Sequence, residues 1–132
     1  MQSLLFQFPI NQLKLNKSVK LFNNVYFTPI LIDKLIIIIQ KLIDLNKSGI
    51  FNIASNQRLS KYKFGLLIAK KFRLKSNNLK EIQIESLKHL TKRPKDMSLS
   101  NKKIKKFFPN YYFDIHKNLD ELYKNEKNNY NR

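Results

Sequence analysis

The sequence predicts an α/β fold in which helices are connected by a few short strands. Apolar residues recur at helical spacing in two segments, 29–45 and 61–72, and shorter stretches rich in Ile, Val and Phe lie around them. A chain of 132 residues that is 42% apolar is long enough to bury a hydrophobic core. We therefore expect one domain over residues 1–126, followed by a polar tail over residues 127–132.

The beginning of the chain predicts a helix and then an extended segment. Residues 1–8 are largely apolar and could form a helix. Lys20–Phe22 and Val25–Phe27 flank the pair Asn23-Asn24, which indicates a strand that ends in a tight turn.

The next segment predicts a long helix over residues 29–45. Thr28 is a suitable N-cap, and Pro29 is suited to the first helical position. At about 100° per residue the polar side chains of this segment fall within an arc of about 120°. We therefore expect the helix to be buried around most of its circumference.

The middle of the chain predicts a strand and a capped helix. Gly49–Ser55 has the composition of a short buried strand. Ser60 is a suitable N-cap for a helix over 61–72. This helix ends in basic residues, whose positive charges interact favourably with the negative end of the helix dipole.

The last third of the chain predicts short elements. Glu81–Glu85 alternates as a strand does, and residues 91–99 indicate a loop. Ser100 and Asp114 are suitable N-caps, the first for a short helix over 101–107 and the second for the last helix.

The formal net charge of +17 raises the question of a polyanionic partner. Lysine supplies 22 of the 26 basic residues and is spread over every segment. Because Lys, Asn and Ile have AT-rich codons, an AT-rich genome explains this composition without any pressure from function. A nucleic-acid-binding protein more typically gathers arginine on one face. Nucleic-acid binding is therefore the alternative and not the favoured function.

Several classes of protein are excluded by composition. The chain has no cysteine, which excludes disulfides, thiolate zinc sites and cysteine nucleophiles, and its two histidines stand far apart. No secretory signal is visible, and the apolar run over 30–45 carries too many charges for a membrane span. We expect a cytoplasmic protein without a metal site.

Four motifs in order resemble one enzyme family. They are Val25-Tyr26-Phe27-Thr28-Pro29-Ile30, Gly49-Ile50-Phe51-Asn52-Ile53, Ser60-Lys61-Tyr62-Lys63-Phe64-Gly65 and Arg93-Pro94-Lys95-Asp96-Met97-Ser98-Leu99. Their order and spacing resemble the C-terminal part of dTDP-4-dehydrorhamnose reductase-like proteins, which are extended short-chain dehydrogenases acting on sugar nucleotides. The resemblance covers about residues 5–108.

The resemblance implies the substrate-binding region of such an enzyme with the Rossmann core missing. The family begins with a dinucleotide-binding fold that has a Gly-rich turn, and it uses a Tyr-x-x-x-Lys pair for proton transfer. The only glycines here are Gly49 and Gly65, and the one Tyr-x-x-x-Lys match, Tyr123–Lys127, follows the motifs that it should precede. We expect no cofactor site in this chain, although NADP or NAD is implied for the full-length family.

The resemblance also implies a substrate site and no catalytic residue. The site residues are Tyr26, Phe27, Thr28, Pro29 and Arg93. Each has a structural alternative: Thr28 as an N-cap, one of the two aromatic rings as core, and Arg93 as a loop anchor that bonds backbone carbonyls or a carboxylate such as Asp96. In its functional role Arg93 would pair with a diphosphate.

The implied function is that of a C-terminal fragment of an NAD(P)-dependent sugar-nucleotide reductase, in a pathway towards surface polysaccharide. Such a fragment binds a nucleotide sugar and is not catalytically competent alone. It is either a decayed gene product or one half of a split enzyme, whose partner is a separately encoded Rossmann half. A non-catalytic interaction domain is a further alternative.

Overall fold

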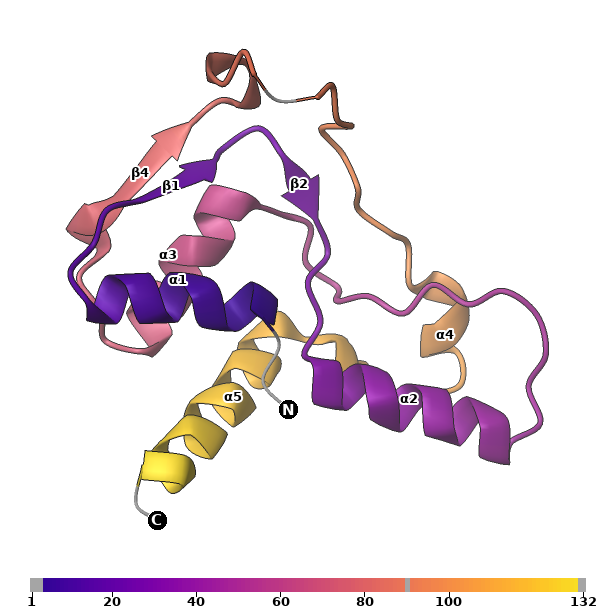
Figure 1. The fold of residues 1–132 in the computed structure, drawn as a ribbon. Coiled ribbons are helices and arrows are strands. Elements are labelled where there is room, and N and C mark those ends of the chain that lie inside the picture. The colour runs from indigo at the N-terminus through magenta and orange to yellow at the C-terminus, as the bar shows by residue number, and fades with distance from the viewer. Residues whose placement is uncertain (1–3, 90, 131–132) are drawn as a thin grey trace. The chain divides into compact units, whose positions relative to one another are not determined.

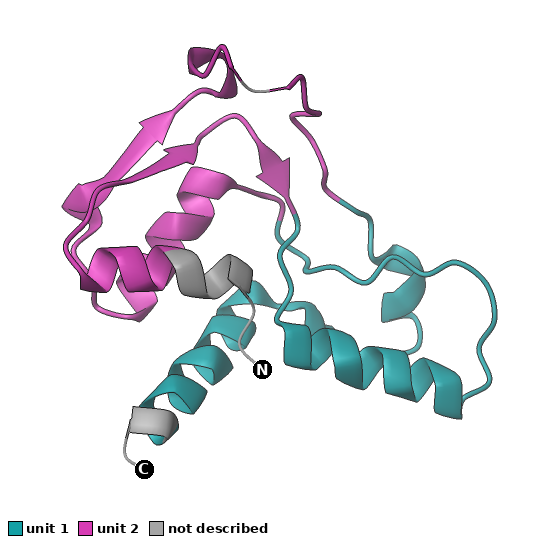
Figure 2. Ribbon diagram, viewed as in Figure 1, with its two compact units in different colours: residues 1, 28–57, 99–132 teal, residues 2–27, 58–98 magenta. Residues whose placement is uncertain are grey.

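A computed structural model describes residues 4–89 and 91–130 of the chain (Figure 1). Apart from Met1, the chain divides into two compact units (Figure 2): unit 1 comprises residues 28–57 and 99–132, and unit 2 comprises residues 2–27 and 58–98. The described residues form helices and two small sheets of two strands each, with no full Rossmann core among them. The predicted fold class is thus confirmed.

Unit 2 is built on a parallel pair of strands. β1 (Val19–Phe22) pairs with β4 (Leu79–Ile82), with Val19 opposite Leu79. Parallel strands need a crossover connection, and helix α3 (Lys61–Lys71) lies within the one used here. The buried core residues of this cluster come from α1 (Leu4–Lys14), both strands and α3: Leu13, Val19, Ala69 and Leu79.

A second, antiparallel pair stands next to the parallel one in the sequence. β2 (Tyr26–Phe27) pairs with β3 (Leu59–Ser60), and Tyr26 is opposite Ser60. The bend at Asn23-Asn24 therefore redirects the chain from one strand partner to another and does not close a hairpin between β1 and β2. Two 3-10 turns, Ser76–Asn78 and Ile84–Ser86, flank β4.

Helix α3 begins where the sequence predicts. Ser60 is its N-cap, and the Ser60 hydroxyl accepts a hydrogen bond from the Lys63 amide over 3.2 Å. Because an N-cap hydroxyl satisfies one of the unpaired amides of the first turn, we expect Ser60→Ala to lower the free energy of unfolding by about 1 kcal/mol. Urea denaturation measures this change, and Ser76→Ala, at an exposed position outside any cap bond, is the matched control.

Unit 1 is mainly helical. It contains α2 (Ile32–Asp44), α4 (Lys102–Lys105), a 3-10 turn over Asn110–Phe113, and α5 (Ile115–Tyr130). Its buried cluster draws on all but the last of these elements: Ile38, Leu42, Ile104, Phe108, Tyr112 and Phe113.

The predicted start of the long helix was wrong. α2 begins at Ile32, and the Thr28 hydroxyl is no cap but accepts a hydrogen bond from the Leu99 amide over 3.2 Å. Pro29 is buried before the helix begins. The local signal of Thr-Pro failed because a backbone amide 71 residues away uses the threonine hydroxyl.

Asn118 does the work of a cap for α2 from a distant part of the sequence. This fully buried side chain accepts a hydrogen bond from the Leu31 amide through Oδ1 over 2.8 Å. Its Nδ2 donates to the carbonyl oxygens of Tyr112 (3.1 Å) and Asp114 (2.9 Å). One side chain thus ties α2 to the beginning of α5.

The predicted strand over Gly49–Ser55 was also wrong. The segment is irregular and pairs with no strand among the described residues. Side chains meet its backbone carbonyls instead: the Lys103 amine donates to Ile50 O (2.8 Å) and the Asn101 amide to Ala54 O (2.9 Å). A strand forms only beside a partner, and its composition alone does not supply one.

Of the two N-caps predicted for the last two helices, one is wrong and the other is confirmed. α4 has Asn101 at its N-cap position without a cap bond, so Ser100 does not cap it. Asp114 does cap α5, since its Oδ1 accepts from the amides of His116 (2.8 Å) and Lys117 (3.4 Å). α5 continues to Tyr130, past the expected end of the domain at residue 126.

Within residues 4–89 and 91–130, no helix has the length and apolar character that crossing a membrane requires.

Candidate functional site

A loop is predicted over 91–99, and the part of it in unit 2, residues 91–98, lies against β2. The Tyr26 amide donates to Lys95 O over 2.7 Å, and the Met97 amide donates to Tyr26 O over 3.0 Å. Tyr26 also forms an isolated parallel bridge with Asp96. The structure thus brings together two of the motifs on which the resemblance depends, although about 70 residues separate them in the sequence.

An arginine that the sequence analysis missed fixes this loop. Arg58 donates through Nε (3.0 Å) and Nη2 (2.8 Å) to Asp96 Oδ2, and its guanidinium carbon lies 3.8 Å from the centroid of the Tyr26 ring. Asp96 Oδ1 accepts from the Ser98 amide (3.0 Å) and hydroxyl (2.6 Å). The hydrogen bonds from Arg58, followed by those from Ser98, hold the pKa of Asp96 well below its usual range.

Substitution of Arg58 should loosen the loop. In Arg58→Ala we expect the Met97 amide to exchange with solvent about three to ten times faster, because an exposed ion pair and a cation–π contact are lost together. Hydrogen exchange followed by NMR measures this rate. Arg58→Lys keeps the charge but not the two-nitrogen contact, so its Met97 amide should exchange at a rate between those of the wild type and Arg58→Ala. An unchanged exchange rate in Arg58→Ala would contradict the anchoring role.

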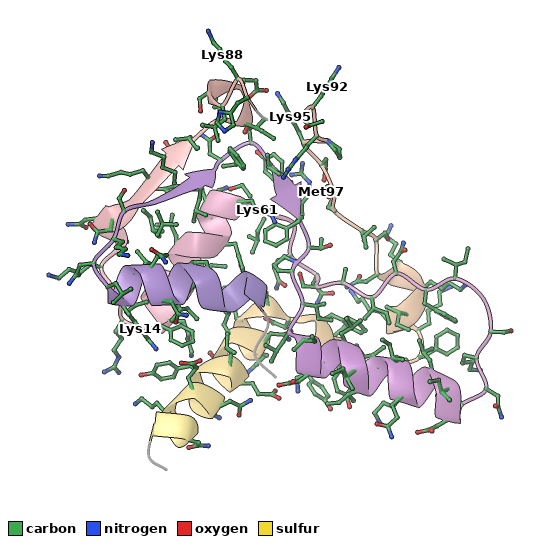
Figure 3. The ribbon with its side chains drawn as sticks, viewed as in Figure 1. Lys14, Lys61, Lys88, Lys92, Lys95 and Met97 are labelled. Carbon is green, nitrogen blue, oxygen red and sulfur yellow. The ribbon has the colours of Figure 1, made fainter. Side chains whose placement is uncertain are left out.

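A half-buried lysine lies beneath the same strand. The Lys61 amine is 3.8 Å from the centroid of the Phe27 ring, and Phe27 packs edge-to-face on Phe64 at 5.3 Å between centroids. Burial lowers the pKa of Lys61. Figure 3 shows Lys61 at the start of α3 near β2, with Met97 on the neighbouring loop. Phe27 is buried, so it fills the core role that we expected of one of the two aromatic residues.

A second ion pair closes the other end of the loop. Lys95 pairs with Glu85, and the Asn24 amide donates to Glu85 Oε2 over 2.7 Å. Asn24 Oδ1 in turn accepts from the Ile84 amide over 3.0 Å. The hydrogen bond from Lys95 is the largest cause that lowers the pKa of Glu85 to about 2.

These carboxylates should make the stability of unit 2 dependent on pH. A carboxyl whose pKa is lowered by folding stabilises the fold fully above its unfolded pKa of about 4.5, and that contribution is lost as the pH falls towards 2. We expect the urea midpoint to decrease when the pH is lowered from 6 to 3, and to decrease less in Glu85→Gln than in the wild type. Glu81→Gln, at an exposed carboxylate on β4, is the control, and its urea midpoint should decrease as much as that of the wild type.

Arg93 is exposed on the loop and has no hydrogen bond or ion pair with any residue that the structure describes. Asp96, its expected partner as a loop anchor, pairs with Arg58 instead. Lys88 and Lys92 stand on either side of residue 90 and point away from the ribbon (Figure 3). The loop therefore presents Arg93 and Lys92 to solvent, whereas its one acidic residue, Asp96, is paired with Arg58.

The sequence-predicted site residues fall in both units. Tyr26, Phe27 and Arg93 belong to unit 2, whereas Thr28 and Pro29 belong to unit 1. The residue that sequence reasoning missed is Arg58; its scarcity, as one of four arginines, was the only signal in the sequence.

Within the described part of the chain, the predicted site residues belong neither to a metal-binding cluster nor to a pocket that lies in unit 1. No group of three or more His, Asp or Glu side chains in the described part of the chain could hold a metal ion. Unit 1 has an open pocket of about 420 Å³ that contains none of the predicted site residues. Its lining residues are Lys41, Asp44, Leu45, Phe107, Phe108, Pro109 and Tyr112.

Comparison with solved structures places the fold among reductases of sugar nucleotides. A hypothetical dTDP-4-dehydrorhamnose reductase from Sulfolobus tokodaii is 31% identical, with a TM-score of 0.71 over 82% of this chain and 38% of that one. A dTDP-4-dehydrorhamnose reductase ortholog from Clostridium acetobutylicum is 21% identical, with a TM-score of 0.79 over 92% and 43%. The reductase from Bacillus anthracis, in complex with NADP, is 17% identical, with a TM-score of 0.77 over 92% and 42%.

The chain spans about two fifths of the length of these reductases. Among curated proteins no relative matches it. The family model of the RmlD substrate binding domain matches residues 6–128, which is nearly the whole sequence. The chain therefore belongs to the RmlD substrate-binding domain family.

Proposed function

We propose that this chain supplies the nucleotide-sugar-binding part of an NAD(P)-dependent reductase in the cytoplasm and does not reduce the sugar by itself. The match of the substrate-binding family over residues 6–128 is the observation that carries the proposal. The reductases with the same fold are named for a dTDP-linked keto sugar, which makes a dTDP-sugar the first ligand to test.

The loop over 91–98 supports a role in binding the diphosphate. Arg93 is an exposed guanidinium with no partner among the described residues, and an arginine can hold two phosphate oxygens at once. Lys92 adds a second exposed cation beside it. Because Arg58 and β2 hold the loop in place, these cations would be positioned before the ligand arrives.

The aromatic and neighbouring residues would bind the rest of the ligand. Arg58 lies 3.8 Å from the centroid of the Tyr26 ring, and this partly exposed ring would stack on a base or sugar. Phe27, which packs on Phe64 in the core, would hold the strand in place beside the ligand. Thr28 and Pro29 follow β2 directly in the sequence, and the family resemblance implies that they border the sugar.

The described residues do not fit a dinucleotide. A Rossmann site needs a strand that leads through a glycine turn into a helix. β1 instead leads into Asn23-Asn24, and β4 leads into a 3-10 turn. Gly65 lies inside α3, and Gly49 lies in the irregular segment after α2. We therefore propose that a separately encoded Rossmann half supplies NADP or NAD, and we assign no hydride-transfer step to this chain.

Calorimetric titration of the purified chain with dTDP-rhamnose tests the proposal. We expect binding that Arg93→Ala weakens about 10- to 100-fold, since a hydrogen bond between charged groups contributes about 1.5–3 kcal/mol. Lys75→Ala removes the same charge from an exposed position outside the loop and should bind as the wild type does.

Three results would overturn the proposal. The first is the absence of binding at millimolar ligand, and the second is binding that Arg93→Ala leaves unchanged. The third is oxidation of NADPH by the purified chain with a dTDP-4-keto sugar, which would show that the chain acts alone.

A further inference from the structure

A half-buried lysine of unit 2 has no partner for its charge. Lys61 is the first residue of α3, and its amine forms no hydrogen bond or ion pair with any residue that the structure describes. A protonated lysine amine has three hydrogen-bond donors, which an exposed lysine satisfies with water. Lys61 lies partly away from water, so its donors have lost part of that solvation.

The immediate surroundings of Lys61 compensate its charge only in part. The amine lies 3.8 Å from the centroid of the Phe27 ring, and a ring face attracts a cation but offers no oxygen to accept its hydrogen bonds. The first turn of α3 contains no acidic residue and is the positive end of the helix dipole, where a cation is unfavourable. Burial lowers the pKa of Lys61, which indicates that these neighbours do not replace the lost solvation.

The acidic side chains of unit 2 are used elsewhere. They are Glu81, Glu85 and Asp96. Asp96 pairs with Arg58, Glu85 pairs with Lys95, and Glu81 is exposed on β4. The unit thus offers Lys61 no countercharge, and an anion from a bound molecule would supply one.

The backbone fixes Lys61 beside the strand that carries the proposed site. The Lys61 amide donates to Val25 O over 3.0 Å, and the preceding residue, Ser60, is opposite Tyr26 in the β2–β3 pair. The N–H and C=O of Tyr26 bond the loop over 91–98, which therefore runs along the other edge of β2. Lys61 and the loop thus flank the same strand within one unit, as Figure 3 shows.

We propose that Lys61 is a further ligand-binding residue of this site and that its amine binds a diphosphate oxygen of the nucleotide sugar. This inference rests on the proposed function, because the ligand is the one proposed there. Both phosphates of a diphosphate have anionic oxygens, so one phosphate can bind Arg93 while the other binds Lys61. The bound oxygen would be the acceptor that the surroundings of Lys61 lack.

Substitution by methionine separates the charge of Lys61 from its packing. Lys61→Met keeps a long, unbranched side chain and removes the ammonium group. We expect this variant to bind dTDP-rhamnose about 10- to 100-fold more weakly in calorimetric titration, because a hydrogen bond between charged groups is lost. In urea denaturation it should be at least as stable as the wild type, because an unpaired, half-buried charge is removed.

The matched control is Lys63→Met. It removes the same charge from an exposed position two residues later in the same helix, and it should bind dTDP-rhamnose as the wild type does. If Lys61 served packing alone, Lys61→Met and Lys63→Met would bind alike.

A second measurement uses the wild-type chain and depends on no variant. NMR of the lysine ε-methylene groups gives the pKa of Lys61 and of Lys63, with and without inorganic pyrophosphate at constant ionic strength. An anion beside an amine favours the charged form and raises the pKa. We expect saturating pyrophosphate to raise the pKa of Lys61 by about 1 more than that of Lys63.

Three results would overturn the inference. They are equal binding of dTDP-rhamnose by Lys61→Met and Lys63→Met, an unchanged pKa of Lys61 in pyrophosphate, and an equal rise at both lysines. The last result would show only a general attraction of the anion to a chain with a net charge of +17.

The failure of this inference can be distinguished from the failure of the proposed function. Binding of dTDP-rhamnose that Arg93→Ala weakens and Lys61→Met does not weaken would keep the proposed function and overturn the role of Lys61. Absence of dTDP-rhamnose binding would overturn the proposed function. The pyrophosphate measurement would then still decide whether Lys61 binds an anion, since it requires no nucleotide sugar.

Discussion

Phe113→Ala is expected to lower the free energy of unfolding by about 3–5 kcal/mol, the range for removing a large buried aromatic side chain. Phe113 is fully buried in the cluster of unit 1 that also contains Ile38, Ile104 and Phe108. Removal of its ring would leave a cavity between α2, α4 and the 3-10 turn. Its backbone carbonyl, which accepts from the Asn56 amide over 2.7 Å, would remain.

Urea denaturation measures the loss, and Phe107→Ala is the control. Phe107 is 42% exposed and makes edge contact with Phe51 at 6.0 Å between ring centroids. The same substitution there should lower the free energy of unfolding by about 1 kcal/mol, because a large part of the ring already faces water. Similar losses for the two variants would show that Phe113 does not occupy the core.

Asn118→Leu is expected to lower the free energy of unfolding by about 2–4 kcal/mol, even though leucine is more apolar. The substitution removes three hydrogen bonds at once and leaves the Leu31 amide and the Tyr112 carbonyl without their partner in a buried site. Each buried polar group without a partner costs about 1–3 kcal/mol. The end of α2 nearest Leu31 should fray first.

Two measurements test this expectation. Urea denaturation gives the total loss, with Asn125→Leu at an exposed position of the same helix as the control, which should change by less than about 0.5 kcal/mol. Hydrogen exchange of the first α2 amides reports the local effect. A loss below about 1 kcal/mol, or unchanged exchange at those amides, would mean that Asn118 does not hold the helix.

Elements fixed by neighbours in the sequence could be predicted. Ser60 caps α3 through an amide three residues later, and Asp114 caps α5 through amides two and three residues later. Their partners lie within one helical turn, so residue type and spacing were sufficient information.

Elements fixed by distant partners could not be predicted. Thr28 looks like a cap in its local context, but its hydroxyl is taken by Leu99, and the end of α2 is satisfied by Asn118, 87 residues from Leu31. In the loop over 91–98, Asp96 is bound by Arg58 and not by Arg93, its near neighbour. Single-sequence patterns do not contain these pairings.

The order of the four motifs predicted the family although no motif alone was specific, and the substrate-binding family match confirms it. The strand expected over Gly49–Ser55 shows the limit of such a pattern. Its apolar residues are those of a buried strand, but no strand pairs with it among the described residues. Residue composition thus indicates that a segment can form a strand, but it does not indicate whether a second strand lies beside it.

The polypeptide passes between the two units three times, at residues 27–28, 57–58 and 98–99. During translation unit 2 can close once residue 98 has emerged, whereas residues 28–57 must wait for the last third of the chain before Ile104 and Phe108 can cover them. The nascent protein would expose its isoleucine-rich segment over residues 30–43 throughout that interval. For the same reason no contiguous truncation isolates either unit without part of the other.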